Sequence, residues 1–334
     1  EVSQGTLQTE YEFQSLCCQL TGMEVANAGM YDGSTSLAEG ALMAARITKR
    51  DRIAVLDTVS PTYRQVLKTY THAQGLKIDT ISRGQTQLEN GTACVIAQQP
   101  NFFGYMEEMT AISELAHLNQ ALLVAYVDPM SLGMFMPPGN YGADIVASEG
   151  QAIGVPPTFG GPYVGIFACK EQHLRQMPGR IVGKTVDTQG RKAYVLTLQT
   201  REQHIRRERA TSNICTSVAL IALMSTVYMT AYGSRGMRHV SEMCYHKSHY
   251  AASLIEKIRG YSLPMEGTFF QEFVIQCPIP PSEINMNLLD HRIIGGLDIS
   301  AHIPNGMLIC VTDINSREEI ENLAVALSEI GARA

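Results

Sequence analysis

Short, continuously apolar runs recur through the first half of the chain, and stretches with helical periodicity lie between them. Runs without polar alternation are typical of strands buried on both faces, and joining them through helices favours a mainly parallel sheet. The predicted strands are Ile53–Leu56, Lys77–Ile81, Cys94–Ala97, Leu122–Val127, Ile145–Ala147 and Tyr163–Ala168, and the predicted connecting helices are Pro61–Gln74 and Met106–Gln120. The pattern therefore predicts an α/β fold.

Further elements are predicted on either side of this series. Apolar side chains recur at i, i+3, i+4 and i+7 in the first segment, which predicts a helix that ends at Gly22. A second helix is predicted from the turn at Asp32 to about Thr48. The later sequence predicts a hairpin over 179–200, helices over 212–232, 238–259 and 316–330, and strands over 269–276 and 307–311. This order predicts a large α/β domain over residues 1–237 and a smaller α/β domain over residues 238–334.

The composition of the 334 residues excludes several classes of protein. Hydrophobic residues make up 45% and charged residues 17%, which is enough apolar surface for a large core and excludes a disordered chain. A net charge of −6 argues against a nucleic-acid-binding surface, and no apolar run approaches the roughly 20 residues of a membrane span. The eight cysteines include no Cys-x-x-Cys pair, which predicts reduced, mostly buried thiols in a cytosolic protein without a metal site.

The loop that opens the second helix, Tyr31-Asp-Gly-Ser-Thr-Ser36, is a candidate anion site. Ligands of open α/β sheets bind beyond the carboxyl ends of the strands, and a small-residue turn at a helix N-terminus can hold a phosphate with free N–H groups and hydroxyls. The alternative is an ordinary N-cap formed by Asp32 or Ser34. The N-cap is favoured, because a carboxylate at the helix N-terminus would compete with an anionic ligand.

Two further loops follow predicted strands. Asp128 ends the strongest strand, where its carboxylate can pair with a protonated ring nitrogen of a cofactor or form an Asx-turn before Pro129, and the turn is favoured. Beyond Ile145–Ala147 the chain carries a Gly/Pro-rich loop that ends in Gly160-Gly161-Pro162. Such a loop is typical of a ligand-facing edge, and it is also compatible with a rigid turn.

A basic run lies downstream and contains Arg201, Arg206, Arg207 and Arg209. Acidic residues are interleaved with these arginines and no row of aromatic side chains accompanies them, so ion pairing in a loop or interface is favoured over nucleic-acid binding. One of the arginines could hold a substrate carboxylate through a bidentate contact. The tract Thr211-Ser-Asn213 is predicted to cap the helix that follows.

Four longer motifs resemble those of one family. They are Met30-Tyr-Asp-Gly-Ser-Thr-Ser-Leu-Ala-Glu, Asp128-Pro-Met-Ser-Leu-Gly, Met177-Pro-Gly-Arg-Ile-Val-Gly-Lys-Thr-Val-Asp and His204-Ile-Arg-Arg-Glu-Arg-Ala-Thr-Ser-Asn-Ile-Cys-Thr. The order of the motifs resembles that of fold-type I enzymes, which use pyridoxal phosphate. Their wording is similar to the glycine decarboxylase P-protein, in particular to its N-terminal half, which many bacteria make as a separate subunit 1. The resemblance covers essentially the whole chain, and it implies a further family segment before the point that matches Glu1.

The resemblance implies a cytoplasmic bacterial complex, a heterotetramer, that decarboxylates glycine and passes the aminomethyl group to the lipoyl arm of the H-protein. It also implies that subunit 2 supplies the lysine that forms a Schiff base with pyridoxal phosphate, while subunit 1 shares the fold without that lysine. Counting back from the Gly-Gly-Pro turn, the matching position here is Gln151, whose amide cannot form a Schiff base. None of the eight lysines lies in that loop, and Lys170 is expected to face solvent.

The resemblance further implies that the Gly-Gly loop of one subunit reaches the cofactor of the other. Candidate donors to the cofactor phosphate held by subunit 2 are therefore Thr158, Gly160 and Gly161, although the loop could instead only pack at the interface. Candidates for a vestigial site in this chain are Ser34, Thr35 and Asp128. No catalytic residue is assigned to this chain.

Two other classes of function remain open. The chain could be an autonomous pyridoxal-phosphate enzyme, such as an aminotransferase or a desulfurase, or a non-catalytic interaction protein of the same fold. Cofactor held by the isolated chain would favour the first, and glycine-dependent exchange of carbon dioxide only after mixing with a lysine-bearing subunit would exclude the second.

Overall fold

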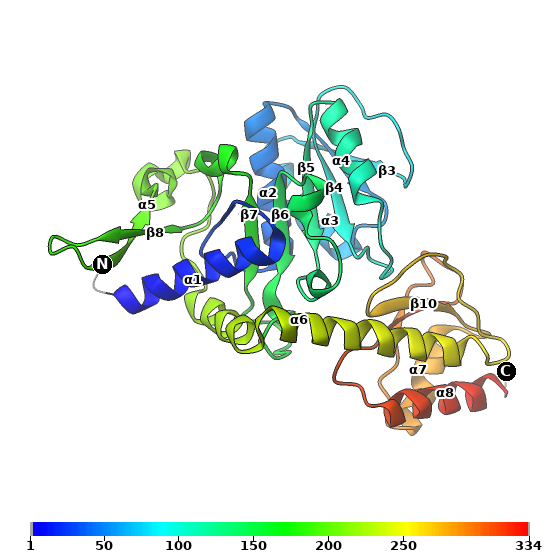
Figure 1. Ribbon diagram of the computed structural model, residues 1–334. Helices are drawn as coiled ribbons and strands as arrows, with labels where there is room; N and C mark the ends of the chain where they lie inside the picture. The colour runs from blue at the N-terminus through cyan, green and yellow to red at the C-terminus, as the bar shows by residue number, and fades with distance from the viewer. Residues whose placement is uncertain (1–2, 333–334) are drawn as a thin grey trace. The chain divides into compact units, whose positions relative to one another are not determined.

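The computed structural model describes residues 3–332, which form two compact units (Figure 1). The first unit comprises the residues up to Gln99 together with Glu108–Met237. The second comprises Pro100–Glu107 together with the residues from Arg238 onward. All of the candidate site residues predicted from the sequence lie in the first unit.

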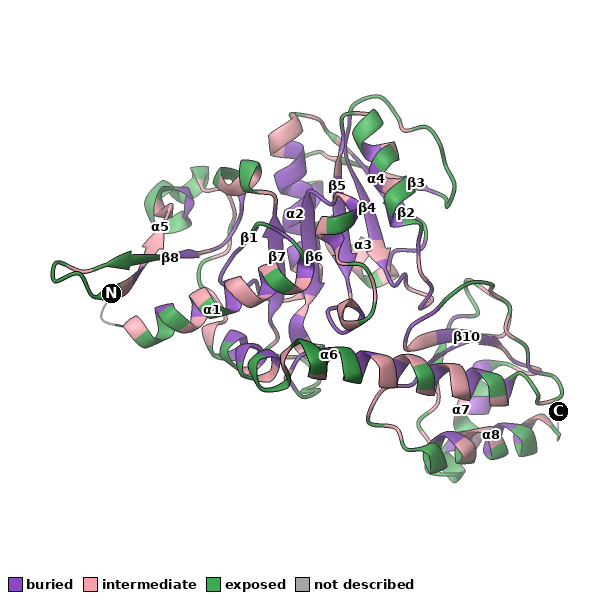
Figure 2. Ribbon diagram, in the orientation of Figure 1, coloured by how far each residue is buried: buried purple, intermediate pink, exposed green. Residues whose placement is uncertain are grey.

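The first unit is built on a seven-stranded sheet in the order β1-β7-β6-β5-β4-β2-β3. Strands β2 to β6 run parallel, whereas β7 is antiparallel to both of its neighbours. The central strands are almost wholly buried, which explains their continuously apolar sequences (Figure 2). The strands are β1 Val25–Ala26, β2 Arg52–Leu56, β3 Lys77–Ile81, β4 Thr92–Gln99, β5 Leu122–Val127, β6 Ile145–Glu149 and β7 Gly165–Cys169. The predicted α/β fold with a mainly parallel sheet is therefore confirmed.

Four helices accompany this sheet, namely α1 Gln4–Thr21, α2 Gly33–Thr48, α3 Pro61–His72 and α4 Met109–Leu118. As predicted, α1 ends at Gly22, whose φ of 68° suits a helix C-cap. α2 packs on the central strands with α3 beside it. Its small side chains allow a close approach, since a Cβ added at Gly40 would lie 3.1 Å from Val124 Cγ1. This packing fixes the N-terminus of α2 relative to the strand ends.

A hairpin and an irregular segment follow the sheet. The hairpin is confirmed, with β8 Ile181–Val186 paired to β9 Lys192–Thr197. After the short helix α5 Gln203–Arg206, the chain stays irregular, and the helix predicted to start near Ser212 starts only at Ala219. The predicted cap at Thr211-Ser-Asn213 is therefore wrong. Ser212 instead donates its hydroxyl hydrogen to Glu39 Oε1 on α2 (2.6 Å).

The two long helices predicted next form one element, α6 Ala219–Ile255. Its two parts meet at Gly233, whose φ of 60° and ψ of −178° are not helical. A left-handed φ is inexpensive only for glycine, so the kink falls where the sequence allows it. The break predicted over residues 233–237 is thus a kink at a single residue.

The second unit contains a three-stranded antiparallel sheet in the order β10-β12-β11. Its elements are β10 Glu272–Gln276, α7 Pro281–Asp290, β11 Leu297–Asp298, β12 Gly306–Cys310 and α8 Arg317–Gly331. α8 begins with a capping box between Ser316 and Glu319. The core of the second unit includes the fully buried side chains of Phe273, Ile284 and Leu327. The sequence analysis missed α7, whose start follows two prolines that read as a turn.

Candidate functional site

The N-terminus of α2 and the carboxyl ends of β5 and β6 meet at one edge of the large sheet. Gly33, the first residue of α2, lies so close to both strands that an added Cβ would be 2.7 Å from Tyr126 Oη and 2.9 Å from Glu149 Cβ. Ligands of open α/β sheets bind at such an edge. We therefore take these three elements as the candidate site.

Asp32 caps α2 as the sequence predicts. Its Oδ1 accepts hydrogen bonds from the backbone N–H of Thr35 (2.9 Å) and the hydroxyl of Ser34 (2.5 Å). The hydroxyl of Thr35 donates to the backbone oxygen of Asp32 (3.2 Å). The N-cap interpretation is confirmed, and the hydroxyls of Ser34 and Thr35 are hydrogen-bonded within the turn itself.

Glu149, the last residue of β6, supplies a second carboxylate at this helix end. Its Oε2 accepts the backbone N–H of Gly33 (2.8 Å) and its Oε1 accepts the backbone N–H of Gln151 (3.1 Å). Burial raises the pKa of Glu149 to about 7, and the nearby carboxylate of Asp32 acts in the same direction. The Glu149 side chain thus joins the first turn of α2 to the loop that leaves β6.

Two tyrosines close the same edge from β5 and α3. The hydroxyls of Tyr126 and Tyr63 lie 2.7 Å apart, and their rings are tilted with centroids 4.5 Å apart. Burial raises the pKa of Tyr126 well above its usual value, so this hydroxyl stays neutral. The sequence analysis missed Glu149 and both tyrosines. Glu149 could have been found from its position at a strand end, which is the criterion that selected Asp128.

Asp128 adopts the favoured Asx-turn. Its Oδ1 accepts the backbone N–H groups of Met130 (2.8 Å) and Ser131 (3.1 Å). Burial raises the pKa of Asp128, while these two hydrogen bonds oppose that rise. The carboxylate therefore shapes the loop after β5, as the turn interpretation predicts.

The Gly/Pro-rich loop after β6 starts and ends beside this cluster, but its middle part is exposed. Gln151 is half-buried beside Glu149, but the chain from Pro156 to Gly160 is exposed, including Thr158. Phe159 is 99% exposed, and an added Cβ at Gly160 would meet no atom within 4 Å. The structure thus does not bring Thr158, Gly160 and Gly161 together with Ser34, Thr35 and Asp128. Thr158 and Gly160 are exposed, and Gly161 is half-buried.

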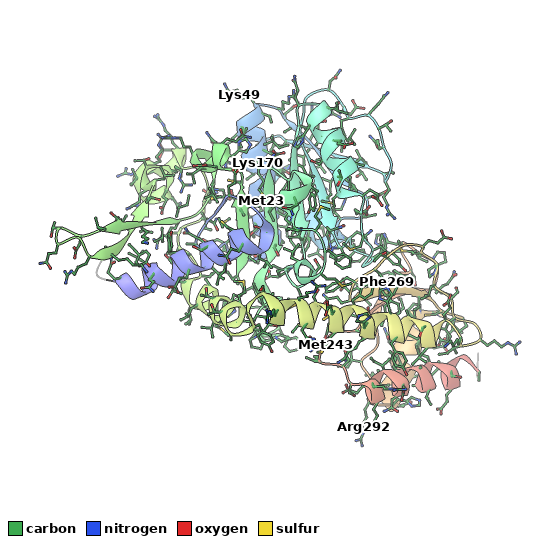
Figure 3. The ribbon with its side chains drawn as sticks, in the orientation of Figure 1. Met23, Lys49, Lys170, Met243, Phe269 and Arg292 are labelled. Carbon is green, nitrogen blue, oxygen red and sulfur yellow. The ribbon has the colours of Figure 1, made fainter. Side chains whose placement is uncertain are left out.

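Lys170, which follows β7, does not simply face solvent as expected (labelled in Figure 3). Its Nζ lies 2.6 Å from Oδ1 of Asp144, whose side chain is only 4% exposed. Oδ2 of Asp144 also contacts His117 Nε2 (2.8 Å) and accepts the backbone N–H of Leu123 (2.9 Å). Burial alone would raise the pKa of Asp144, but the hydrogen bonds from Lys170 and His117 outweigh it and lower the pKa. Lys170 is therefore a structural partner of Asp144.

The basic run divides into one buried and several exposed arginines. Arg201 is buried and donates to the backbone oxygens of Met177 and Gly179, so it holds the loop before the hairpin, and it also interacts electrostatically with Glu202. Glu202 also forms an ion pair with Arg180, whose Nε lies 3.7 Å from Glu202 Oε2. The arginines at 206, 207 and 209 are exposed.

Two buried carboxylates fix the irregular segment between α5 and α6. Glu39 on α2 binds the Ser212 hydroxyl, and Glu10 on α1 accepts the hydroxyl hydrogen of Ser217 (2.5 Å). Burial raises the pKa of both Glu10 and Glu39, and each serine hydrogen bond opposes that rise. This segment belongs to the longest of the sequence motifs and is held by side chains rather than by regular structure.

Comparisons with solved structures place the fold in a known class. The chain matches a cysteine desulfurase from Thermococcus onnurineus with a TM-score of 0.70 at 17% identity, covering 100% of this chain and 86% of that one. It matches a crystal structure of glycine decarboxylase (P-protein) of the glycine cleavage system, in inhibitor-bound form, with a TM-score of 0.95 at 40% identity, covering 99% and 77%. The fold is that of the fold-type I enzymes that depend on pyridoxal phosphate.

The family follows from comparisons of sequence. The glycine cleavage system P-protein family matches residues 1–327. The probable glycine dehydrogenase (decarboxylating) subunit 1 of Desulforamulus reducens is 50% identical over 342 residues, covering 99% of this chain and 77% of that protein. The corresponding protein of Thermomicrobium roseum is 48% identical with the same coverage. The chain belongs to the glycine cleavage system P-protein family.

The residues of this chain do not fit the cofactor of the fold class. Enzymes of this kind hold pyridoxal phosphate through a lysine, and a helix N-terminus is suited to its phosphate. Here the sequence analysis expects Gln151 at the position of that lysine, and the N–H groups of Gly33 and Thr35 are bonded to Glu149 and Asp32.

Within residues 3–332 no three His, Cys, Asp or Glu side chains are arranged to hold a metal ion. None of the helices in the same range is long and apolar enough to cross a membrane.

Proposed function

We propose that this chain is subunit 1 of a split glycine decarboxylase, and that it completes the active site of a lysine-bearing subunit 2 instead of binding pyridoxal phosphate itself. The match of 99% of this chain to proteins named glycine dehydrogenase (decarboxylating) subunit 1 supports the assignment. The observation that carries the division of labour is the strand end at β6, where Gln151 stands at the matched lysine position and Glu149 occupies the helix N-terminus.

In this proposal the complex decarboxylates glycine and transfers the aminomethyl group to the lipoyl group of the H-protein. The complex would be a cytoplasmic heterotetramer, and pyridoxal phosphate bound in subunit 2 would supply the electron sink for decarboxylation. This chain would contribute contacts at the interface. Its exposed Gly/Pro-rich loop supports this role, because Phe159 and Thr158 stand free of the rest of the chain and are available to a partner.

The test is a mixing experiment with the lysine-bearing subunit. We expect a stable complex, and glycine-dependent exchange of carbon dioxide only when both subunits and the H-protein are present. Exchange by subunit 2 alone at the same rate would contradict the proposal. Cofactor absorbance that stays with the isolated chain after desalting would instead support an autonomous pyridoxal-phosphate enzyme.

The contribution of the loop is tested separately. If Thr158, Gly160 and Gly161 donate to the phosphate in subunit 2, Thr158→Val should increase the rate at which the assembled complex loses cofactor. Thr69→Val is the matched control, because Thr69 is exposed on α3 and its hydroxyl bonds only within the helix, to Gln65. Unchanged retention in the Thr158 variant would leave the loop with a packing role only.

A further inference from the structure

We infer that Glu149 closes the cofactor site of this chain by placing its own carboxylate where the fold would hold a phosphate. The inference rests on the proposed function but concerns a different question, namely why this copy of the fold would not hold a cofactor. Loss of the lysine alone would remove covalent attachment, and it would leave an anion cradle at the N-terminus of α2. The structure shows that the cradle itself is filled.

The first support is the geometry of the helix end. The backbone N–H of Gly33 points to Glu149 Oε2 at 2.8 Å, a distance typical of a hydrogen bond to a charged acceptor. The N–H of Thr35 and the hydroxyl of Ser34 are both bonded to Asp32 Oδ1. Donors in the first turn that suit an oxyanion are therefore bonded to carboxylates of this chain.

The second support is the lack of space. Glu149 and Tyr126 approach Gly33 to within contact distance, since even a single Cβ there would lie 2.7 Å from Tyr126 Oη and 2.9 Å from the backbone nitrogen of Glu149. The space in front of the Gly33 N–H is itself taken, because Glu149 Oε2 lies 2.8 Å from that nitrogen. A phosphate oxygen could therefore reach this N–H only if the Glu149 side chain left.

The third support is charge. Glu149 and Asp32 face the same helix end from β6 and from the N-cap, and the two carboxylates already disfavour one another, which is part of why the pKa of Glu149 is raised. A phosphate dianion added beside them would meet two like charges at a site that is half-buried. Among the described residues, the other titratable groups grouped here with Glu149 are Tyr126, Tyr63 and Asp128, and none of them supplies a cation.

The test measures binding of inorganic phosphate to the full chain, without its partner, by equilibrium dialysis at pH 8. The wild-type chain should show no saturable binding. Glu149→Ser and Glu149→Ala should each bind one phosphate per chain, with a dissociation constant at least about tenfold lower than any seen for wild type. Glu149→Gln should behave as wild type, because it removes the charge but keeps the side-chain volume beside Gly33.

Glu319→Ser is the matched control, since Glu319 is also a carboxylate at a helix N-terminus, in the capping box of α8. It should gain no binding, and an equal gain there would overturn the inference. Folded Glu149→Ser and Glu149→Ala chains that bind no phosphate would overturn it as well. If neither variant folds, hydrogen exchange decides the matter in the wild-type chain. The amides of Gly33 and Thr35 should be protected and unaffected by phosphate, and slowing by phosphate would overturn the inference.

These outcomes are independent of the mixing experiment with subunit 2. Failure to assemble or to exchange carbon dioxide would remove the proposed function and leave the phosphate result standing. A wild-type chain that binds phosphate would remove this inference and leave the assignment as subunit 1 standing.

Discussion

The backbone N–H of Gly33 donates to Glu149 Oε2 at 2.8 Å, and this hydrogen bond joins two points of the chain that are 116 residues apart in sequence. One end is the first residue of α2 and the other is the last residue of β6. A carboxylate at a helix N-terminus is stabilised by the unpaired N–H groups there. Burial at the same position disfavours its charge, so the bond has a definite dependence on pH.

Glu149→Gln should flatten the dependence of stability on pH. The pKa of Glu149 is raised from 4.5 to about 7, so the folded state holds the proton more tightly than the unfolded state. Stability contributed by this group is therefore full below about pH 4.5 and falls as the pH rises through 7, by about 3 kcal/mol. Thermal unfolding at pH 5, 6, 7 and 8 should show a smaller decline in the variant. In Glu319→Gln the decline should be unchanged.

Gly33→Ala should destabilise the first unit by steric overlap. The added Cβ would lie 2.9 Å from the backbone nitrogen of Glu149, which cannot move without shifting β6. We expect a loss of about 1–3 kcal/mol in the free energy of unfolding, measured with urea. Gly5→Ala in α1 is the matched control, because a Cβ there meets nothing within 4 Å and alanine favours the helix. A loss of equal size in both variants would contradict the steric explanation.

Ser217→Ala should loosen the irregular segment before α6. The substitution removes the hydrogen bond to Glu10 Oε1 and leaves a buried carboxylate with one partner fewer. The cost should be about 2 kcal/mol. Trypsin should then cut faster at the exposed arginines 206, 207 and 209. Glu10→Gln should cost less in the Ser217→Ala background than in the wild-type chain. Strictly additive losses of the two substitutions would show that the pair is not coupled.

Asp144→Asn should be among the most destabilising polar substitutions in the first unit. Asn cannot satisfy both Lys170 and His117, so the half-buried ammonium of Lys170 loses its charged partner and keeps only the backbone oxygen of Gly142, at a cost of about 3 kcal/mol. The comparison is Asp187→Asn, which breaks only the exposed pair with Arg191 in the hairpin turn. Urea unfolding at pH 7 should separate the two clearly. Similar losses would show that the Asp144 pair is worth no more than a surface pair.

Much of the fold could be predicted from the sequence because its strands are buried on both faces and therefore read as apolar runs. Each strand predicted for the large sheet is present, and the helix N-cap at Asp32 is present as predicted. The start of α6 was wrong because Ser212 bonds to Glu39, which is 173 residues away, and no local pattern reports such a bond. The division into domains at residue 237 stays a prediction about independently folding parts.

The candidate site was predicted less completely for a related reason. The turn at Asp128 has a local signal, since Asx-turns form within a few residues. The filling of the α2 N-terminus depends on a strand that is distant in sequence, so the Gly-Ser-Thr turn alone could not distinguish an open cradle from a closed one. The roles assigned to Thr158, Gly160 and Gly161 remain predictions, because they concern contacts with another chain.

The tight fit around Gly33 has a consequence for reading genomes. Because Tyr126 and Glu149 leave no room for a side chain at this position, glycine is required there whether or not any ligand binds. If Glu149 closes the site as inferred, a motif scan that infers phosphate binding from the Gly-Ser-Thr signature would wrongly assign cofactor binding to this chain. The residue at the end of β6 would then have to be read together with that signature.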